Sequence, residues 1–102
     1  MRMVGTAQEP DLAFLPWDTP LEEWPEDLVV ALPRGISRHI VRFVRLNGIV
    51  YAIKEAEFEL VEREYNLLGE LQRRAVPCVE PVGTFSDRSD LHGEALPCAL
   101  IT

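Results

Sequence analysis

The sequence has little of what builds a covalent or metal-held scaffold, and it has no long hydrophobic run. Its two cysteines, Cys78 and Cys98, stand twenty residues apart without neighbouring ligand residues, which argues against a disulfide framework or a zinc site. No stretch free of Asp, Glu, Lys and Arg exceeds eight residues, too few for a transmembrane helix or the apolar core of a signal peptide. We therefore expect no membrane association and a cytoplasmic location.

Lysine is also scarce, because Lys54 stands alone beside nine arginines. The 102 residues, 47% of them hydrophobic, suit one small globular domain with a net charge of −7. Residues 9–27 carry seven acids and no base, whereas residues 28–54 carry five bases and no acid. This basic island could hold a phosphate group locally, or it could be one solvated hairpin. The acidic chain as a whole argues against a nucleic-acid partner.

Residues 1–26 form an acidic N-terminal segment with four of the eight prolines and both tryptophans. The prolines exclude most regular structure here, with one short exception. Thr19-Pro20-Leu21-Glu22 has the capping threonine, first-turn proline and glutamate of a helix start. We expect Trp17 and Trp24 to fasten the segment onto the domain, although an interaction surface is the alternative.

Residues 27–102 are expected to form the domain proper. Apolar and alternating runs predict strands over 28–32, 38–45 and 49–54. Asn47-Gly48, between the second and third, is the strongest short-range hairpin signal, since both turn positions need a positive φ. Two further strands are predicted over 78–85 and 96–101, joined by a polar loop over 86–94.

Residues 55–74 predict one long helix. Acidic residues crowd its first turns and Arg73 and Arg74 stand in its last, which suits the helix dipole. At about 100° per residue, one half of the helix is apolar, with Phe58, Val61, Tyr65, Leu68 and Leu71. The expected fold is therefore α+β, an antiparallel sheet of about five strands packed on one long helix.

Lys54 ends the third predicted strand. The period of two places Val50, Ala52 and Lys54 on one face of the sheet. A flexible ammonium beside a small residue suits a site that grips phosphate. The alternative is a lysine that only terminates a strand.

Glu64 lies in the apolar half of the predicted helix, where a carboxylate is costly unless a cation or hydrogen-bond donors meet it. Because so short a chain offers no second layer, the helix should face the sheet, with Lys54 as the nearest cation. Arg38 or Arg42 from the neighbouring strand is the alternative partner. Glu64 could also extend its carboxylate past the edge of the core.

The turn between the first two predicted strands, residues 33–39, is the third candidate. Its backbone amides, the Ser37 hydroxyl and Arg38 could cover a phosphate, although an ordinary hairpin turn fits equally well. His39 and His92 have no evident partner and are expected to be structural or solvated. The cysteines are expected to be small strand residues, since no base stands near either of them.

The order of these elements resembles the N-terminal lobe of the protein-kinase-like fold. Tyr51-Ala52-Ile53-Lys54 is similar to the Val-Ala-Ile-Lys strand of kinases, and Glu64 to the glutamate that pairs with its lysine. Residues 76–83 are similar to a segment of aminoglycoside and lipopolysaccharide-core kinases. Residues 32–39, with 20–25 before them, resemble a bacterial domain family of unknown function described as lipopolysaccharide-kinase-like. The resemblance covers residues 27–102.

The resemblance implies the ATP-binding N-lobe of a phosphotransferase. Lys54 would hold the α- and β-phosphates, Glu64 would orient Lys54, and Ala52 would floor the adenine. The phosphates would be covered by Gly35, Ser37 and Arg38. The resemblance places the hinge at residues 100–102, so the catalytic loop and the Mg²⁺ ligands would belong to a missing C-terminal lobe. No catalytic residue is then expected in this chain, and a lone lobe is expected to self-associate through apolar surface at the helix and the last strand.

Two alternatives remain from the residues themselves. A kinase-like domain could bind a nucleotide or a partner without transferring phosphate, in a regulatory role. A small nucleic-acid-binding domain could use the arginine hairpin, but the net charge of −7 argues against it, as does the presence of only one aromatic residue, Phe43, among the arginines.

Overall fold

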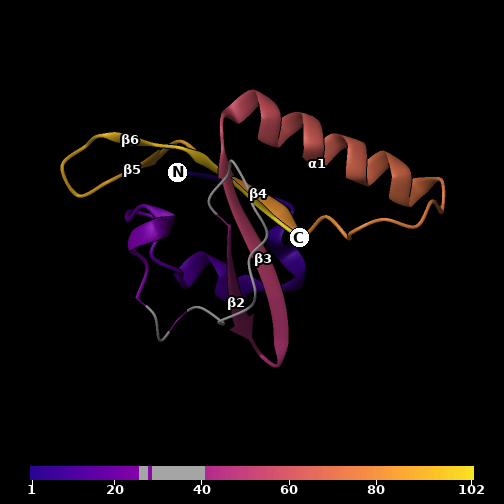
Figure 1. The fold of residues 1–102 in the computed structure, drawn as a ribbon, viewed down its shortest axis with the longest axis horizontal. Coiled ribbons are helices and arrows are strands. Elements are labelled where there is room, and N and C mark those ends of the chain that lie inside the picture. Colours follow the sequence, from indigo (N-terminus) through magenta and orange to yellow (C-terminus); the bar gives the residue numbers. More distant parts are fainter. Residues whose placement is uncertain (26–27, 29–40) are drawn as a thin grey trace.

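The computed structural model describes residues 1–25, 28 and 41–102, and its centre is a five-stranded antiparallel sheet (Figure 1). The order of the strands is β1-β4-β7-β3-β2. The strands are β1 (Arg2–Val4), β2 (Val41–Leu46), β3 (Ile49–Ala56), β4 (Gly83–Ser86) and β7 (Cys98–Ile101). A two-stranded sheet of β5 (Arg88–Ser89) and β6 (Ala95–Leu96) extends the β4–β7 hairpin. The expected α+β class is confirmed. The expected strand over 28–32 lies outside the described residues, Leu28 excepted, as do residues 38–40 of the second.

The β2–β3 hairpin forms where the sequence predicts it. Asn47 and Gly48 occupy the turn with φ of 53° and 81°, so both lie in the left-handed region. The register pairs Leu46 with Ile49 and Val41 with Lys54. Asn47 also donates a hydrogen bond from Nδ2 to Glu9 Oε1 at 2.9 Å, which ties the turn to the N-terminal segment.

The helix α1 (Phe58–Arg73) begins later than predicted. Glu55 and Ala56 continue β3 instead, because they pair with Ala99 and Cys98 of β7 and so keep their ladder hydrogen bonds. At the other end, Ala75 adopts a φ of 57° and Val76 N donates to Leu71 O at 2.9 Å, which closes the helix before Pro77.

The last two predicted strands are shorter than expected because prolines interrupt them. Of the range 78–85, only the part from Gly83 is a strand, since Pro81 lacks the N–H that a ladder needs. Pro97 separates β6 from β7 in the same way. The predicted loop over 86–94 contains β5, and its turn is held by Asp90, whose Oδ1 accepts from the N–H groups of His92 and Glu94.

The N-terminal segment contains more regular structure than its prolines suggest. Its first residues form the edge strand β1, which pairs with β4. A Cβ on Gly83 would lie 2.5 Å from Val4 O, so this close approach requires glycine in β4. Three 3₁₀ helices follow: η1 (Thr6–Gln8), η2 (Pro10–Phe14) and η3 (Leu21–Glu23). The predicted capping at Thr19 is wrong, because its hydroxyl bonds Asp18 and the single turn starts after Pro20 without a side-chain cap.

Both faces of the sheet are covered, which corrects the expectation of a single layer (Figure 1). The N-terminal segment covers one face and contributes Leu12, Leu15, Trp17, Leu21 and Trp24 to the larger core, where they meet Val44, Tyr51, Ile53, Val82, Phe85, Ala99 and Ile101. Trp17 stacks on Phe85 with ring centroids 3.8 Å apart, so the expected fastening role of the tryptophans is confirmed. Helix α1 covers the other face through Val61 and Tyr65, which meet Ala56, Cys98 and Leu100.

Candidate functional site

The predicted pairing of Lys54 with Glu64 is confirmed. Lys54 Nζ lies 2.8 Å from Glu64 Oε2, between β3 and α1. Strand alternation turns Lys54 toward the helix face, because Tyr51, Ile53 and Glu55 are buried on the other face. The helix period turns Glu64 toward the strand. Two independent periodicities therefore bring one cation and one carboxylate together.

The pair is more accessible than a core position would be. The side chains of Lys54 and Glu64 are 27% and 41% exposed. Glu64 lies at the edge of the helix face, beside the buried Val61 but outside the small core itself. Glu64 was expected on a buried helix face. The structure corrects this expectation, because the Glu64 carboxylate lies at the border with solvent, where desolvation is weaker.

Of the other predicted site residues, the structure describes Ala52. Ala52 lies on the same face of β3 as Lys54 and is half-buried, and its N–H and C=O both pair with Thr102 at 3.0 Å. Gly35, Ser37, Arg38 and His39 lie outside the described residues. Arg42 is not the partner of Glu64, because its guanidinium donates to the carbonyl of Glu22 in the N-terminal segment.

A second ion pair lies one residue further along β3, on the opposite face. Arg88 Nη1 lies 2.8 Å from Glu55 Oε2, and the two side chains are 0% and 6% exposed. Glu55 was expected to be the first residue of the helix over 55–74, and Arg88 was not among the predicted site residues. The alternation of Tyr51, Ile53 and Glu55 in an extended β3 would have put Glu55 in the core, but nothing local identified its partner.

A polar cluster at the far end of β3 joins the sheet to the N-terminal segment. Glu9 is buried, and its carboxylate accepts from the Tyr51 hydroxyl at 3.4 Å as well as from Asn47. Burial of the phenol, and next the nearby Glu9 carboxylate, raise the pKa of Tyr51 above its ordinary value. This cluster therefore favours the neutral phenol and has the character of a structural contact.

The two cysteines lie in different surroundings, since Cys98 is buried and Cys78 is exposed. Burial in the small core raises the pKa of the Cys98 thiol, which keeps it protonated at neutral pH. Cys98 is a small strand residue as expected, whereas Cys78 is exposed and lies outside any strand; both are free thiols. Among the residues that the structure describes, no three His, Cys, Asp or Glu side chains are grouped so as to hold a metal ion. Within the same residues, no helix combines the length and the apolar character that crossing a bilayer requires.

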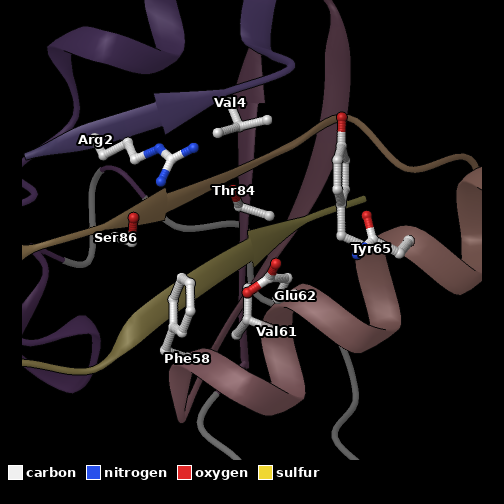
Figure 2. Close-up of a pocket in the computed structure, with 9 residues that line it drawn as sticks. Arg2, Val4, Phe58, Val61, Glu62, Tyr65, Thr84 and Ser86 are labelled. Carbon is white, nitrogen blue, oxygen red and sulfur yellow. The ribbon is translucent and has the colours of Figure 1, made fainter.

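A groove of about 230 Å³ lies between α1 and the strands β1 and β4 (Figure 2). Val61 and Tyr65 line it from the helix, and Thr84 and Ser86 from β4. Figure 2 shows Arg2 on the strand side and Glu62 on the helix side of this groove. Its lining contains neither Lys54 nor Glu64, so it is separate from the ion pair.

Comparison with known proteins gives no relative: no family model, no curated protein and no solved structure matches the chain. The kinase-like resemblance therefore depends on the residues and geometry of this chain alone.

Proposed function

We propose that this chain is the nucleotide-binding lobe of a kinase-like phosphotransferase, with ATP as the ligand and Lys54 as the residue that holds its phosphates. The observation that carries the proposal is the ion pair between Lys54 and Glu64. A strand lysine paired with a helix glutamate is the arrangement that protein kinases use to hold the α- and β-phosphates.

The accessibility of Lys54 supports this role. An ammonium group carries three N–H donors, and Glu64 is its one hydrogen-bond partner among the described residues. With 27% of its side chain exposed, Lys54 has donors left for a phosphate oxygen. Glu64 limits the rotamers of the long lysine side chain, so less conformational entropy is lost when the phosphate binds.

The surroundings of the pair fit the same role. Ala52, two residues before Lys54 on the same face, leaves room beside the ammonium. By the resemblance, Ala52 floors the adenine and residues 34–39 cover the phosphates. The catalytic base and the Mg²⁺ ligands of such an enzyme belong to a second lobe, so the role of these 102 residues is positioning and charge.

The test uses the fact that Lys54 is the only lysine. In protein labelled with ¹³C at lysine, a single side-chain signal reports this site. We expect the signal to shift on titration with ATP, and calorimetry to show binding that Lys54→Ala abolishes. Arg45→Ala is the matched control, because it removes one positive charge from an exposed position of the neighbouring strand. Binding that is absent from the wild type, or that is lost equally in both variants, would refute the proposal.

Phosphate transfer is a separate measurement on the same protein. Since the base and the metal ligands are assigned to a second lobe, we expect residues 1–102 to bind ATP without hydrolysing it or transferring its γ-phosphate. Turnover that disappears in Lys54→Ala would show that the chain holds a complete active site.

A further inference from the structure

The junction between β3 and α1 is anchored from the face opposite the Lys54–Glu64 pair. Glu55, at this junction, is buried, and its Oε2 accepts two hydrogen bonds. One comes from Arg88 Nη1 at 2.8 Å and the other from the backbone N–H of Leu21 at 3.1 Å. Glu55 thus connects the end of β3 with η3 of the N-terminal segment.

Arg88 joins three separate parts of the chain around this carboxylate. Its Nε donates to Trp17 O and its Nη2 to Thr19 O, both at 3.0 Å. Its Nη1 donates to Pro97 O at 2.9 Å in addition to Glu55. The guanidinium also lies 5.4 Å from the centre of the Trp17 ring. A single fully buried side chain therefore connects the N-terminal segment, the turn before β7 and the end of β3.

We infer that Glu55 and Arg88 are positioning residues for the Lys54–Glu64 pair, and that through them the N-terminal segment controls whether this pair forms. Glu55 follows Lys54 directly, and α1, which carries Glu64, begins three residues later at Phe58. Both members of the pair therefore extend from the short stretch that Glu55 anchors. The meaning of this control for ligand binding rests on the proposed function.

The physical reason is the difference in packing between the two pairs. The Lys54 and Glu64 side chains are long and partly exposed, so packing alone does not hold their charged atoms together. Their contact depends on the relative placement of β3 and α1. Glu55 and Arg88 are buried, and their several hydrogen bonds allow one arrangement of the junction. Loosening that arrangement leaves α1 free to move away from Lys54.

The experiment observes the pair directly, without a nucleotide. The ¹³C signal of the only lysine is recorded in the wild type and in Glu64→Ala, which defines its position when Lys54 is unpaired. In Glu55→Gln and in Arg88→Lys, we expect the signal to move at least halfway toward the Glu64→Ala position while the protein stays folded. The control is Val44→Ala, which weakens the same larger core without touching Glu55 and should leave the lysine signal at its wild-type position.

Each outcome decides the inference. A wild-type lysine signal in a folded Glu55→Gln or Arg88→Lys variant overturns it. A shift of equal size in Val44→Ala also overturns it, because general destabilisation would then be the cause. If neither variant folds, the pair has only a structural role and the inference is wrong.

The nucleotide titration separates this inference from the proposed function. If the wild type binds no ATP, the proposed function fails, while the lysine signals still decide whether Glu55 and Arg88 position the pair. If the wild type does bind ATP, the apparent Kd of a variant should rise in proportion to the loss of paired molecules. A Glu55→Gln or Arg88→Lys variant in which a tenth of the molecules form the Lys54–Glu64 pair should show an apparent Kd for ATP raised about tenfold.

Discussion

The two faces of the central sheet differ in how they are covered and in the ion pair that each one carries. On one face, the N-terminal segment builds the larger core and helps to bury Glu55 and Arg88. On the other, α1 covers a smaller core, and Lys54 and Glu64 meet at its edge, partly open to solvent. Neighbouring residues of one strand thus supply a structural charge to one face and an accessible charge to the other. The comparison indicates that stability depends mainly on the first face, whereas the proposed nucleotide site lies on the second.

Removing one partner of the buried pair should give the largest effect. Arg88→Ala leaves the Glu55 carboxylate buried beside Leu21 and removes the hydrogen bonds that Arg88 donates to the carbonyls of Trp17 and Pro97. Thr19 O loses its bond from Arg88 but keeps the one from Trp24 Nε1 at 3.0 Å. We expect the free energy of unfolding to fall by about 3–5 kcal/mol, measured by urea denaturation. The control is Arg73→Ala, at an exposed position at the end of α1. A loss no larger than that of the control would show that the two faces do not differ in this way.

The pH dependence of stability should report the Glu9–Tyr51 contact on the same face. The folded state raises the pKa of Tyr51 above its ordinary value of 10.0, so folding favours the neutral phenol. The stabilisation is therefore complete below about pH 10 and is lost as the pH rises through the folded pKa. Urea midpoints between pH 8 and pH 12 should fall more steeply for the wild type than for Tyr51→Phe. The wild type and Tyr51→Phe both retain Cys98, so the contribution of this thiol to the pH dependence cancels when the two curves are compared. Parallel curves would contradict the prediction.

The Lys54–Glu64 pair should contribute much less to stability. Because both side chains are partly exposed, Lys54→Ala and Glu64→Ala should show a coupling free energy of about 0–1 kcal/mol in a double-mutant cycle. The same variants should affect ATP binding strongly. A coupling free energy as large as that of a buried ion pair would mean that Lys54 and Glu64 are shielded from solvent as well as Glu55 and Arg88 are.

The smallest effect concerns association between copies of the chain. On α1, Leu60 and Leu67 are 43% and 55% exposed and lie two turns apart on one flank, whereas β7 is buried, so the expectation of apolar surface holds for the helix and not for the last strand. We expect weak self-association at high concentration, reduced by Leu60→Gln with Leu67→Gln in sedimentation experiments. Leu91→Gln, in the exposed turn between β5 and β6, is the control. A wild type that stays monomeric at all concentrations would contradict this.

Local patterns were enough to predict one side of the molecule. The Asn47-Gly48 turn needs only two residues with positive φ, and these are adjacent in the sequence. The helix and strand periods place Glu64 and Lys54 on facing surfaces, and the short connection between them leaves few other arrangements. The ion pair was therefore predictable, but its exposure was not, because the edge of a core depends on which neighbours surround it.

The other side was decided by the tertiary structure alone. Trp17 and Arg88 are 71 residues apart, and Leu21 and Glu55 are 34 apart, so no periodicity or spacing connects them. The start of α1 depends on the same long-range pairing, because β7 holds Glu55 and Ala56 in the sheet although their neighbours favour a helix. The sequence by itself determined the hairpin, the helix face and the facing positions of Lys54 and Glu64. The enclosing N-terminal segment and the buried Glu55–Arg88 pair arise only when distant parts of the chain exclude water from each other.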